Sequence, residues 1–307
     1  MLDFRSLGVA LGVALGACAS QRAQGTVPES VHGQAPGRSG DEAAVPVQRG
    51  RAAVNGLSMY YEVHGNAPGV PLVLLHGGGS TIDSNYGRVL PLFARRRTVI
   101  ALEEQAHGRT TDRDTPVRFH TSAEDVATLL GALRIPQADV MGFSNGASVA
   151  LRLAIGHPKL VRRLVFASSI TKKSGAPPQF WELMARATYA DMPHALKEAF
   201  LAVNPDPQKL RVMHDKDLDR MRNFVETTDD EVRGVTTPTL VMLGDRDVST
   251  LEHAAELTRL FPKARLLILP GGHGDYLGEV SSGALDTAYP ALTVGLVEQF
   301  LDAPQKP

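Results

Sequence analysis

An α/β fold with a mostly parallel, eight-stranded sheet is predicted by three features of this 307-residue sequence. First, short apolar runs typical of buried strands alternate with helical patterns, which favours right-handed crossovers and parallel pairing. Second, two alternating segments, Arg51–Val54 and Met59–Val63, are joined by Asn55-Gly56, a pair typical of a type I′ hairpin turn. Third, 43% hydrophobic and 21% charged residues are ordinary for one large domain with a substantial core.

The hairpin should form the antiparallel entry to the sheet, and six further strands should follow it. The most clearly marked helix is expected at Ser122–Leu133, because Thr121 and Glu124 have the spacing of a capping box at its start. The last helix should run from about Ala284 to Leu301. The six strands are expected at Leu72–Leu75, Thr98–Ala101, Asp139–Phe143, Arg163–Ala167, Thr239–Leu243 and Leu266–Leu269.

The strand–helix alternation stops after Ile170 and resumes after Val235, and only helical patterns lie between. Asp215 to Glu226 has the acidic spacing of a calcium loop, but Arg220 stands where that motif requires glycine, so an amphipathic helix is favoured. No HExxH or other metal-ligand spacing occurs elsewhere, and we expect neither a metal nor a cofactor. The helices are expected at Phe180–Thr188, Pro193–Val203 and Leu210–Val225.

The segment Gly142-Phe143-Ser144-Asn145-Gly146 is the best candidate for a nucleophile. It follows the apolar run Ala138 to Met141 and opens a helical pattern, which is the strand–turn–helix context that a Gly-x-Ser-x-Gly elbow requires. Glycines two positions before and after Ser144 would let the strand and helix pack closely around an outward-pointing hydroxyl. The alternative is a simple Gly/Ser turn between the two elements, so the interpretation depends on further residues.

A second motif, His76-Gly77-Gly78-Gly79, follows the strand at Leu72–Leu75. It matches the loop that supplies one oxyanion-binding N–H in lipases and esterases, where glycine lets a backbone amide approach a developing negative charge. The N–H of Gly78, or of Gly79, would be one donor of the oxyanion hole. The N–H of Asn145, at the first position of its helix, would be the other. His76 is expected to brace the loop.

Two further strand ends carry an acid and a histidine. The strand at Thr239–Leu243 runs into Asp245 and Asp247, and the strand at Leu266–Leu269 is followed by a Gly-rich loop that holds His273. Such an acid can orient a histidine and stabilise its imidazolium. All of these candidates follow the carboxyl ends of predicted strands, which is where open α/β sheets place their sites. The order Ser144, acid, His273 is that of Ser…Asp/Glu…His enzymes.

Together these motifs resemble the α/β-hydrolase-fold superfamily, and the likeness covers about 49–307. Gln105 to Thr110 is similar to the turn after the fourth strand of that family, with Ala106 in place of a usual glycine. The resemblance implies that the acid lies three residues after the strand-end Gly244, which selects Asp247 over Asp245. It also implies a helical cap at about 171–235, whose apolar residues, among them Phe180, Trp181 and Met184, would in part face the site.

The resemblance implies a serine hydrolase that cleaves a carboxylic ester or a related small acyl compound, with Ser144, Asp247 and His273 as the triad. C–C bond hydrolysis and perhydrolase or haloperoxidase-like chemistry remain alternatives on such a site. A non-catalytic ligand-binding lipoprotein is a further alternative, although it would be expected to carry a broken triad. The net charge of −1 gives no electrostatic indication of nucleic-acid binding, and the sequence leaves the oligomeric state open.

The N-terminal segment predicts export and lipidation. Residues 6–17 form an apolar stretch that is too short to span a bilayer and is typical of a signal peptide. Leu15-Gly16-Ala17-Cys18 resembles the lipobox of bacterial lipoproteins, in which Cys18, the sole cysteine, becomes the lipidated first residue; ordinary cleavage near Cys18 is the alternative. Residues 18–48 should be a disordered tether. We therefore expect a lipid-anchored domain at the cell envelope, with that lipid as its only membrane contact.

Overall fold

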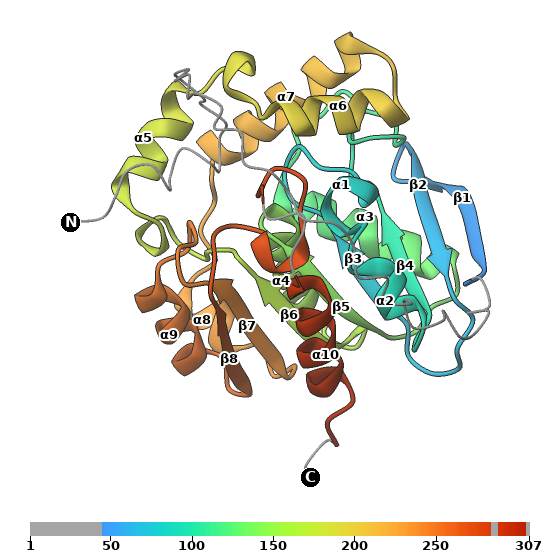
Figure 1. Ribbon diagram of the computed structural model, residues 1–307, viewed down its shortest axis with the longest axis vertical. Coiled ribbons are helices and arrows are strands. Elements are labelled where there is room, and N and C mark those ends of the chain that lie inside the picture. The colour runs from blue at the N-terminus through green and yellow to red at the C-terminus, as the bar shows by residue number, and fades with distance from the viewer. Residues whose placement is uncertain (1–44, 284–287, 305–307) are drawn as a thin grey trace, which may run out of the picture.

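The computed structural model describes residues 45–283 and 288–304 and forms one eight-stranded sheet flanked by helices (Figure 1). The signal segment, Cys18 and the predicted tether up to residue 44 lie outside the described residues. None of the helices in the described part is long and apolar enough to cross a membrane. The strands are β1 (Val47–Val54), β2 (Leu57–His64), β3 (Leu72–Leu75), β4 (Val99–Leu102), β5 (Ala138–Phe143), β6 (Val161–Ala167), β7 (Thr239–Gly244) and β8 (Ala264–Leu269).

The sheet is antiparallel only where the chain enters it. Its strand order is β1-β2-β4-β3-β5-β6-β7-β8; β1 pairs antiparallel with β2 and β2 with β4, and all later pairs are parallel. The turn residues Asn55 and Gly56 have φ values of 45° and 84°, which is the left-handed geometry of the predicted hairpin turn. The predicted α/β class and all eight strands are confirmed, with boundaries that differ by a few residues.

Helices cover both faces of the sheet. Alternate residues of β3 point to opposite faces: Val73 and Leu75 pack with α3 and α4, while Leu72 and Leu74 pack with α1, α2 and α10. The helices are α1 (Ile82–Tyr86), α2 (Leu90–Ala94), α3 (Phe119–Ala132), α4 (Asn145–Gly156), α5 (Pro178–Arg186), α6 (His194–Val203), α7 (Pro207–Arg222), α8 (Asp229–Arg233), α9 (Leu251–Leu260) and α10 (Tyr289–Leu301), with short 3₁₀ turns at Lys173–Gly175, Tyr189–Asp191 and Asp275–Leu277.

The start of α3 differs from the sequence prediction. The helix begins at Phe119 with Arg118 as its N-cap, three residues earlier than expected, so Thr121 lies inside the helix. The Thr121 hydroxyl accepts a hydrogen bond from the Arg118 N–H at 3.3 Å. The predicted capping box from Thr121 to Glu124 is therefore wrong. Burial of Phe119 and its ring contact with Phe224 favour the earlier start.

Figure 1 shows α5, α6 and α7 gathered above one end of the sheet. We call these three elements the lid helices. Apolar side chains of α6 and α7 form a small separate core, in which Phe200, Leu210 and Met213 are fully buried, while Phe180 and Trp181 of α5 pack against the main core. The end of the sheet that they cover is the one where β3, β5, β7 and β8 terminate, and the loops after these strands carry the candidate site residues.

Candidate active site

Ser144 occupies a strained junction between β5 and α4. Its φ and ψ are 54° and −121°, in a region that residues with a side chain avoid at a cost of about 1–3 kcal/mol. A Cβ atom at Gly142 would collide with the Gly146 carbonyl, and one at Gly146 would collide with the Leu75 carbonyl. Both glycines are therefore required by close backbone approach, which holds Ser144 at a sharp strand-to-helix turn next to β3.

The loop after β3 lies beside this turn, because Leu75 is paired with Gly142 in the sheet. Three of its backbone N–H groups have acceptors. That of Gly77 donates to Asn85 Oδ1 at 2.6 Å, that of Gly79 donates to Asp217 Oδ2 at 2.6 Å, and that of Ser80 donates to the Gly77 carbonyl at 3.3 Å. The Gly79 N–H is thus engaged, which removes it as an oxyanion donor.

The N–H of Gly78 is the remaining donor of the loop, and it has no hydrogen-bond acceptor among the described residues. Gly78 lies against Asn145, because a Cβ atom built on it would be 2.5 Å from the Asn145 side-chain nitrogen. The Asn145 N–H is the first of α4 and has no acceptor within the helix. The structure therefore brings Gly78 and Asn145 together beside Ser144, with two backbone donors available.

His76 braces the loop, as the sequence indicates. Its Nε2 accepts the Glu104 N–H at 3.1 Å, so Nδ1 carries the proton and donates to the Gly77 carbonyl at 2.8 Å. Burial lowers the pKa of His76, in keeping with a neutral ring. Because the carbonyl and N–H of one peptide point in opposite directions, holding the Gly77 carbonyl also fixes the direction of the Gly78 N–H.

The loops after β7 and β8 bring Asp247 and His273 into contact, with His273 Nδ1 2.7 Å from Asp247 Oδ1. The Asp247 carboxylate is completely buried and also accepts the Gly244 N–H and the Ser168 hydroxyl. Burial opposes its ionisation, but the charge of His273 and these donors lower the pKa of Asp247 below its usual value. Burial also disfavours the charged ring, yet Asp247 raises the pKa of His273 above 6.5.

Asp245 is placed differently from Asp247. Its carboxylate is half exposed and accepts the Gly271 N–H at 2.7 Å, which ties the loop after β7 to the loop after β8. It makes no recorded contact with His273. The geometry thus gives the two acids different surroundings, with Asp247 on the histidine and Asp245 in the turn.

Two residues that the sequence analysis did not identify support the acid. Ser168, which follows β6 at a φ of 51°, donates its hydroxyl to Asp247 and shares a hydrogen bond with the hydroxyl of the fully buried Tyr276. Ser168 follows a strand end, like the other site residues, but no motif singles it out. Its position beside Asp247 depends on the pairing of β6 with β7.

A cavity of about 200 Å³ joins these groups and lies under the lid helices. Ser144, Asn145 and His273 line it, together with the loop Gly77–Ser80. Glu279 also lines it; this carboxyl group is buried, and its Oε1 has no hydrogen-bond partner among the described residues. The apolar lining from the lid helices comprises Phe180, Met184, Leu196, Met213, Leu218 and Met221, and Met192, just before α6, adds to it.

Trp181 does not line the cavity, contrary to the expectation for the cap. Its indole N–H donates to the Lys173 carbonyl at 2.7 Å, and its ring lies 5.2 Å from that of Phe224. The two neighbours on the same helix, Phe180 and Met184, do line the cavity. Phe180 and Met184 are four positions apart and share one face of α5, whereas the contacts of Trp181 with Lys173 and Phe224 hold its ring away from the cavity.

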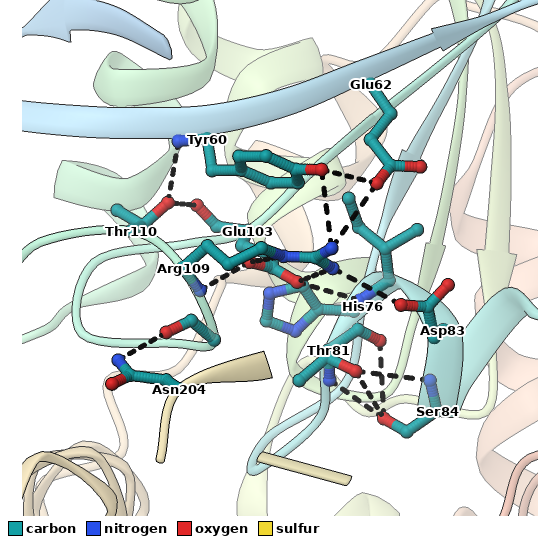
Figure 2. Close-up of polar contacts among 12 residues, drawn as sticks. Tyr60, Glu62, His76, Thr81, Asp83, Ser84, Glu103, Arg109, Thr110 and Asn204 are labelled. Atoms are coloured by element: carbon teal, nitrogen blue, oxygen red, sulfur yellow. Dashed lines mark hydrogen bonds and ion pairs between the residues drawn. The ribbon is translucent and has the colours of Figure 1, made fainter. Parts of the chain in front are cut away.

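The turn after β4 is anchored by Arg109, as Figure 2 shows. Its guanidinium lies 4.2 Å from the centre of the Tyr60 ring and bonds Glu103, which is fully buried, at 2.7 Å. Glu103 in turn accepts the N–H of Ile82, the first residue of α1, at 3.4 Å. Ala106 has a φ of 66°, which explains why glycine is favoured at that position. The arginine is therefore structural and holds the turn beside the oxyanion loop.

Within the described residues, no group of three or more His, Cys, Asp or Glu side chains is arranged to hold a metal ion. The residues Asp215, Asp217 and Asp219 of the calcium-like pattern lie on the continuous helix α7. Asp217 points to the core of the molecule, where it bonds Gly79, while Asp219 pairs with Arg118.

Comparisons with known proteins agree with this architecture. The family described as alpha/beta hydrolase fold matches residues 70–212. A pyrrolizixenacetamide deacetylase of Xenorhabdus hominickii is 29% identical over 144 residues, which cover 46% of this chain and 53% of the relative. A 2-hydroxymuconate semialdehyde hydrolase of Pseudomonas sp. (strain CF600) is 36% identical over 111 residues, covering 35% of this chain and 39% of the relative. The chain thus spans about half or less of the length of these curated relatives.

Solved structures share the fold over most of the chain. A 2-hydroxy-6-oxo-6-phenylhexa-2,4-dienoate hydrolase from Rhodococcus sp. strain RHA1 superposes with a TM-score of 0.69 at 22% identity, covering 84% of this chain and all of the other. An enol-lactonase from Burkholderia xenovorans LB400 superposes with a TM-score of 0.65 at 20% identity, covering 82% and 100%. With its sheet order, its strained serine turn and these matches, the chain has the α/β-hydrolase fold.

Proposed function

We propose that this protein is a serine hydrolase that cleaves carboxylic esters by acyl transfer. The observation that carries the proposal is the geometry of one cavity, in which a strained Ser144, a His273 bonded to the buried Asp247, and two unengaged backbone amides all meet. These are the nucleophile, the oriented base and the oxyanion donors that acyl transfer requires.

In the proposed reaction, the Ser144 hydroxyl attacks the acyl carbonyl carbon while His273 removes its proton. The hydrogen bond to Asp247 holds a proton on Nδ1 of the ring, so Nε2 is left as the base. The amides of Gly78 and Asn145 stabilise the negative oxygen of the tetrahedral intermediate. His273 then protonates the leaving alkoxide, and water hydrolyses the acyl-enzyme by the same steps in reverse order.

Several relatives are named as hydrolases of dienoates. The charges around this cavity favour an uncharged ester over such a substrate. A dienoate is a carboxylate anion, and the acidic side chains lining this cavity are Asp217 and Glu279. Asp217 is paired with Arg220, and burial raises the pKa of Glu279. Among the described residues no Lys or Arg side chain lines the cavity, so a substrate carboxylate would lack a fixed cationic partner there, whereas an uncharged ester needs none.

The test combines a covalent probe with a nucleophile variant. A fluorophosphonate should label the wild-type protein and not Ser144→Ala, and Ser144→Ala should lower kcat for an uncharged p-nitrophenyl ester by about 10⁶-fold. Circular dichroism should show that both proteins are folded alike, because the change removes only one hydroxyl oxygen from a partly buried side chain.

Each other outcome favours a different activity. Equal turnover by Ser144→Ala would exclude the serine mechanism. Faster cleavage of a 2-hydroxy-6-oxo-dienoate than of any ester would favour C–C hydrolysis. A folded wild-type protein that neither reacts with the probe nor turns over any substrate would favour a ligand-binding protein.

A further inference from the structure

A buried cluster of four charged side chains links the lid to the loop that carries Gly78. Helix α7 of the lid contributes Asp217 and Arg220, and the turn after β4 contributes Glu104 and His107. Asp217 Oδ2 lies 2.8 Å from His107 Nε2, and its Oδ1 accepts from Arg220 Nη2. Arg220 Nη1 donates to Glu104 Oε2 at 2.9 Å. All four residues are at least nine-tenths buried.

The hydrogen bonds define the charge on His107. Its Nδ1 faces the Gln105 carbonyl at 2.9 Å and its Nε2 faces the Asp217 carboxylate, and both partners can only accept. Both ring nitrogens must therefore carry protons, so His107 is an imidazolium. Burial opposes that charge, but the nearby Asp217 carboxylate raises the pKa of His107, which agrees with a protonated ring. Two cations and two carboxylates then balance inside the protein, which is the condition for burying such a group.

One oxygen of Asp217 faces out of this cluster toward the oxyanion loop. Besides His107, Asp217 Oδ2 accepts the N–H of Gly79 at 2.6 Å. Gly79 has a φ of 71°, a left-handed conformation that glycine adopts readily, and the bond to Asp217 restrains the orientation of its N–H. The peptide on the other side of Gly78 is held by His76 through the Gly77 carbonyl. The two peptides that flank Gly78 are therefore fixed by separate anchors, one from the core and one from the lid.

We propose that Asp217 is a positioning residue for the oxyanion hole: by accepting the Gly79 N–H, it fixes the peptide that follows Gly78 and so, together with His76 on the preceding peptide, keeps the Gly78 N–H in the direction of the developing negative charge. This inference rests on the proposed serine mechanism and adds a role for the lid. Arg220 and His107 neutralise Asp217, so that its negative charge does not oppose the oxyanion nearby. The hole is completed by the lid helix α7, and is fully formed only when that helix is seated on the core.

The substitution Asp217→Asn tests this with little change in shape. The group at Oδ1 must accept from Arg220, so the amide oxygen is expected there and the NH₂ at the position of Oδ2. That NH₂ can donate to a neutral His107, which keeps the cluster balanced with Glu104 and Arg220 as its one ion pair. It cannot accept from Gly79, whose N–H loses its partner.

We expect Asp217→Asn to lower kcat by about 10–100-fold per active site, with KM changed less than about threefold, since misdirecting one donor costs part of what removing it does. The measurement uses an uncharged p-nitrophenyl ester, with active sites titrated by a fluorophosphonate. The inhibition constant of a trifluoromethyl ketone, which forms a tetrahedral adduct with the serine, should rise by the same factor as kcat/KM falls. Asp219→Asn, on the same helix and half exposed, is the matched control and should leave all three values unchanged.

The outcomes separate the possible roles. If Asp217→Asn lowers the melting temperature and raises KM while kcat per titrated site is retained, Asp217 only seats the lid and the inference is wrong. Unchanged kinetics in a folded Asp217→Asn variant would also overturn it, while leaving the proposed serine mechanism intact. A wild-type protein without probe labelling or ester turnover would instead overturn the proposed function, and with it this inference.

Discussion

At the scale of single residues, the two acids after β7 offer the sharpest test of the proposed triad. Asp247→Asn should lower kcat by about 10³–10⁴-fold, because the amide favours the wrong tautomer of His273. Asp245→Asn should cost no more than about tenfold, because an amide oxygen can still accept the Gly271 N–H. Steady-state kinetics of both variants against one ester give the comparison. A larger loss in Asp245→Asn would transfer the role of the acid to that residue.

A pH profile tests the state of His273. The ring must be neutral to accept the serine proton, and its pKa is raised above 6.5 by Asp247, against the effect of burial, with smaller contributions from Glu279 and Asp275. The ratio kcat/KM should therefore be maximal above this raised pKa and fall tenfold per pH unit below it. In Asp247→Asn the acid limb of the residual activity should move to lower pH, because the carboxylate that raises the pKa of His273 is gone. An acid limb at the same pH in both proteins would assign it to another group.

At the scale of secondary-structure elements, we expect the lid helices to determine which acyl groups the cavity accepts. Phe180→Ala and Met184→Ala should each change the ratio of kcat/KM for long and short acyl esters by about 5–50-fold, because these side chains line the cavity beside Ser144. Phe200→Leu is the control, since Phe200 is fully buried in the lid and does not line the cavity. It should lower the melting temperature and leave the ratio unchanged. Parallel losses for all esters in all three variants would show that the lid is only scaffold.

The elements also differ in how well the sequence predicts them. The strand β3 is predicted to the residue, because four consecutive apolar side chains are buried on both faces and bounded by a proline and the His-Gly loop. The start of α3 is not, because its first turn is set by burial of Phe119 against Phe224, a residue more than a hundred positions away. Local capping residues set the start of a helix only where no tertiary contact with a distant residue favours a different start.

At the scale of the whole molecule, we propose that the domain is held at the cell envelope through Cys18. Replacing Cys18 with Ser should move the protein from the membrane fraction to the soluble fraction of its host, because a lipid on this cysteine is the only anchor the sequence suggests. Immunoblotting of the membrane and soluble fractions of cells makes the measurement. Unchanged fractionation would contradict the proposed lipid anchor.

The sequence by itself determined the α/β class and the order in which the candidate triad residues follow one another along the chain, and it indicated Ser144, His273 and Gly78 as candidate site residues. Each of these leaves a local trace: a strand period, a glycine spacing, or a residue at a strand end. The distinction between Asp245 and Asp247 needed either a family resemblance or the observed contact with His273.

Only the tertiary structure decided the supporting residues. Ser168 reaches Asp247 because β6 lies beside β7, and Asp217 reaches Gly79 across 138 positions because α7 folds back over the sheet. In the sequence, Asp217 is one of several acids on a polar helix, and no pattern there indicates a contact with the loop after β3. The physical reason is that a hydrogen bond depends on distance in space, whereas a motif records only distance along the chain. Contacts between distant segments are set by how the whole core packs.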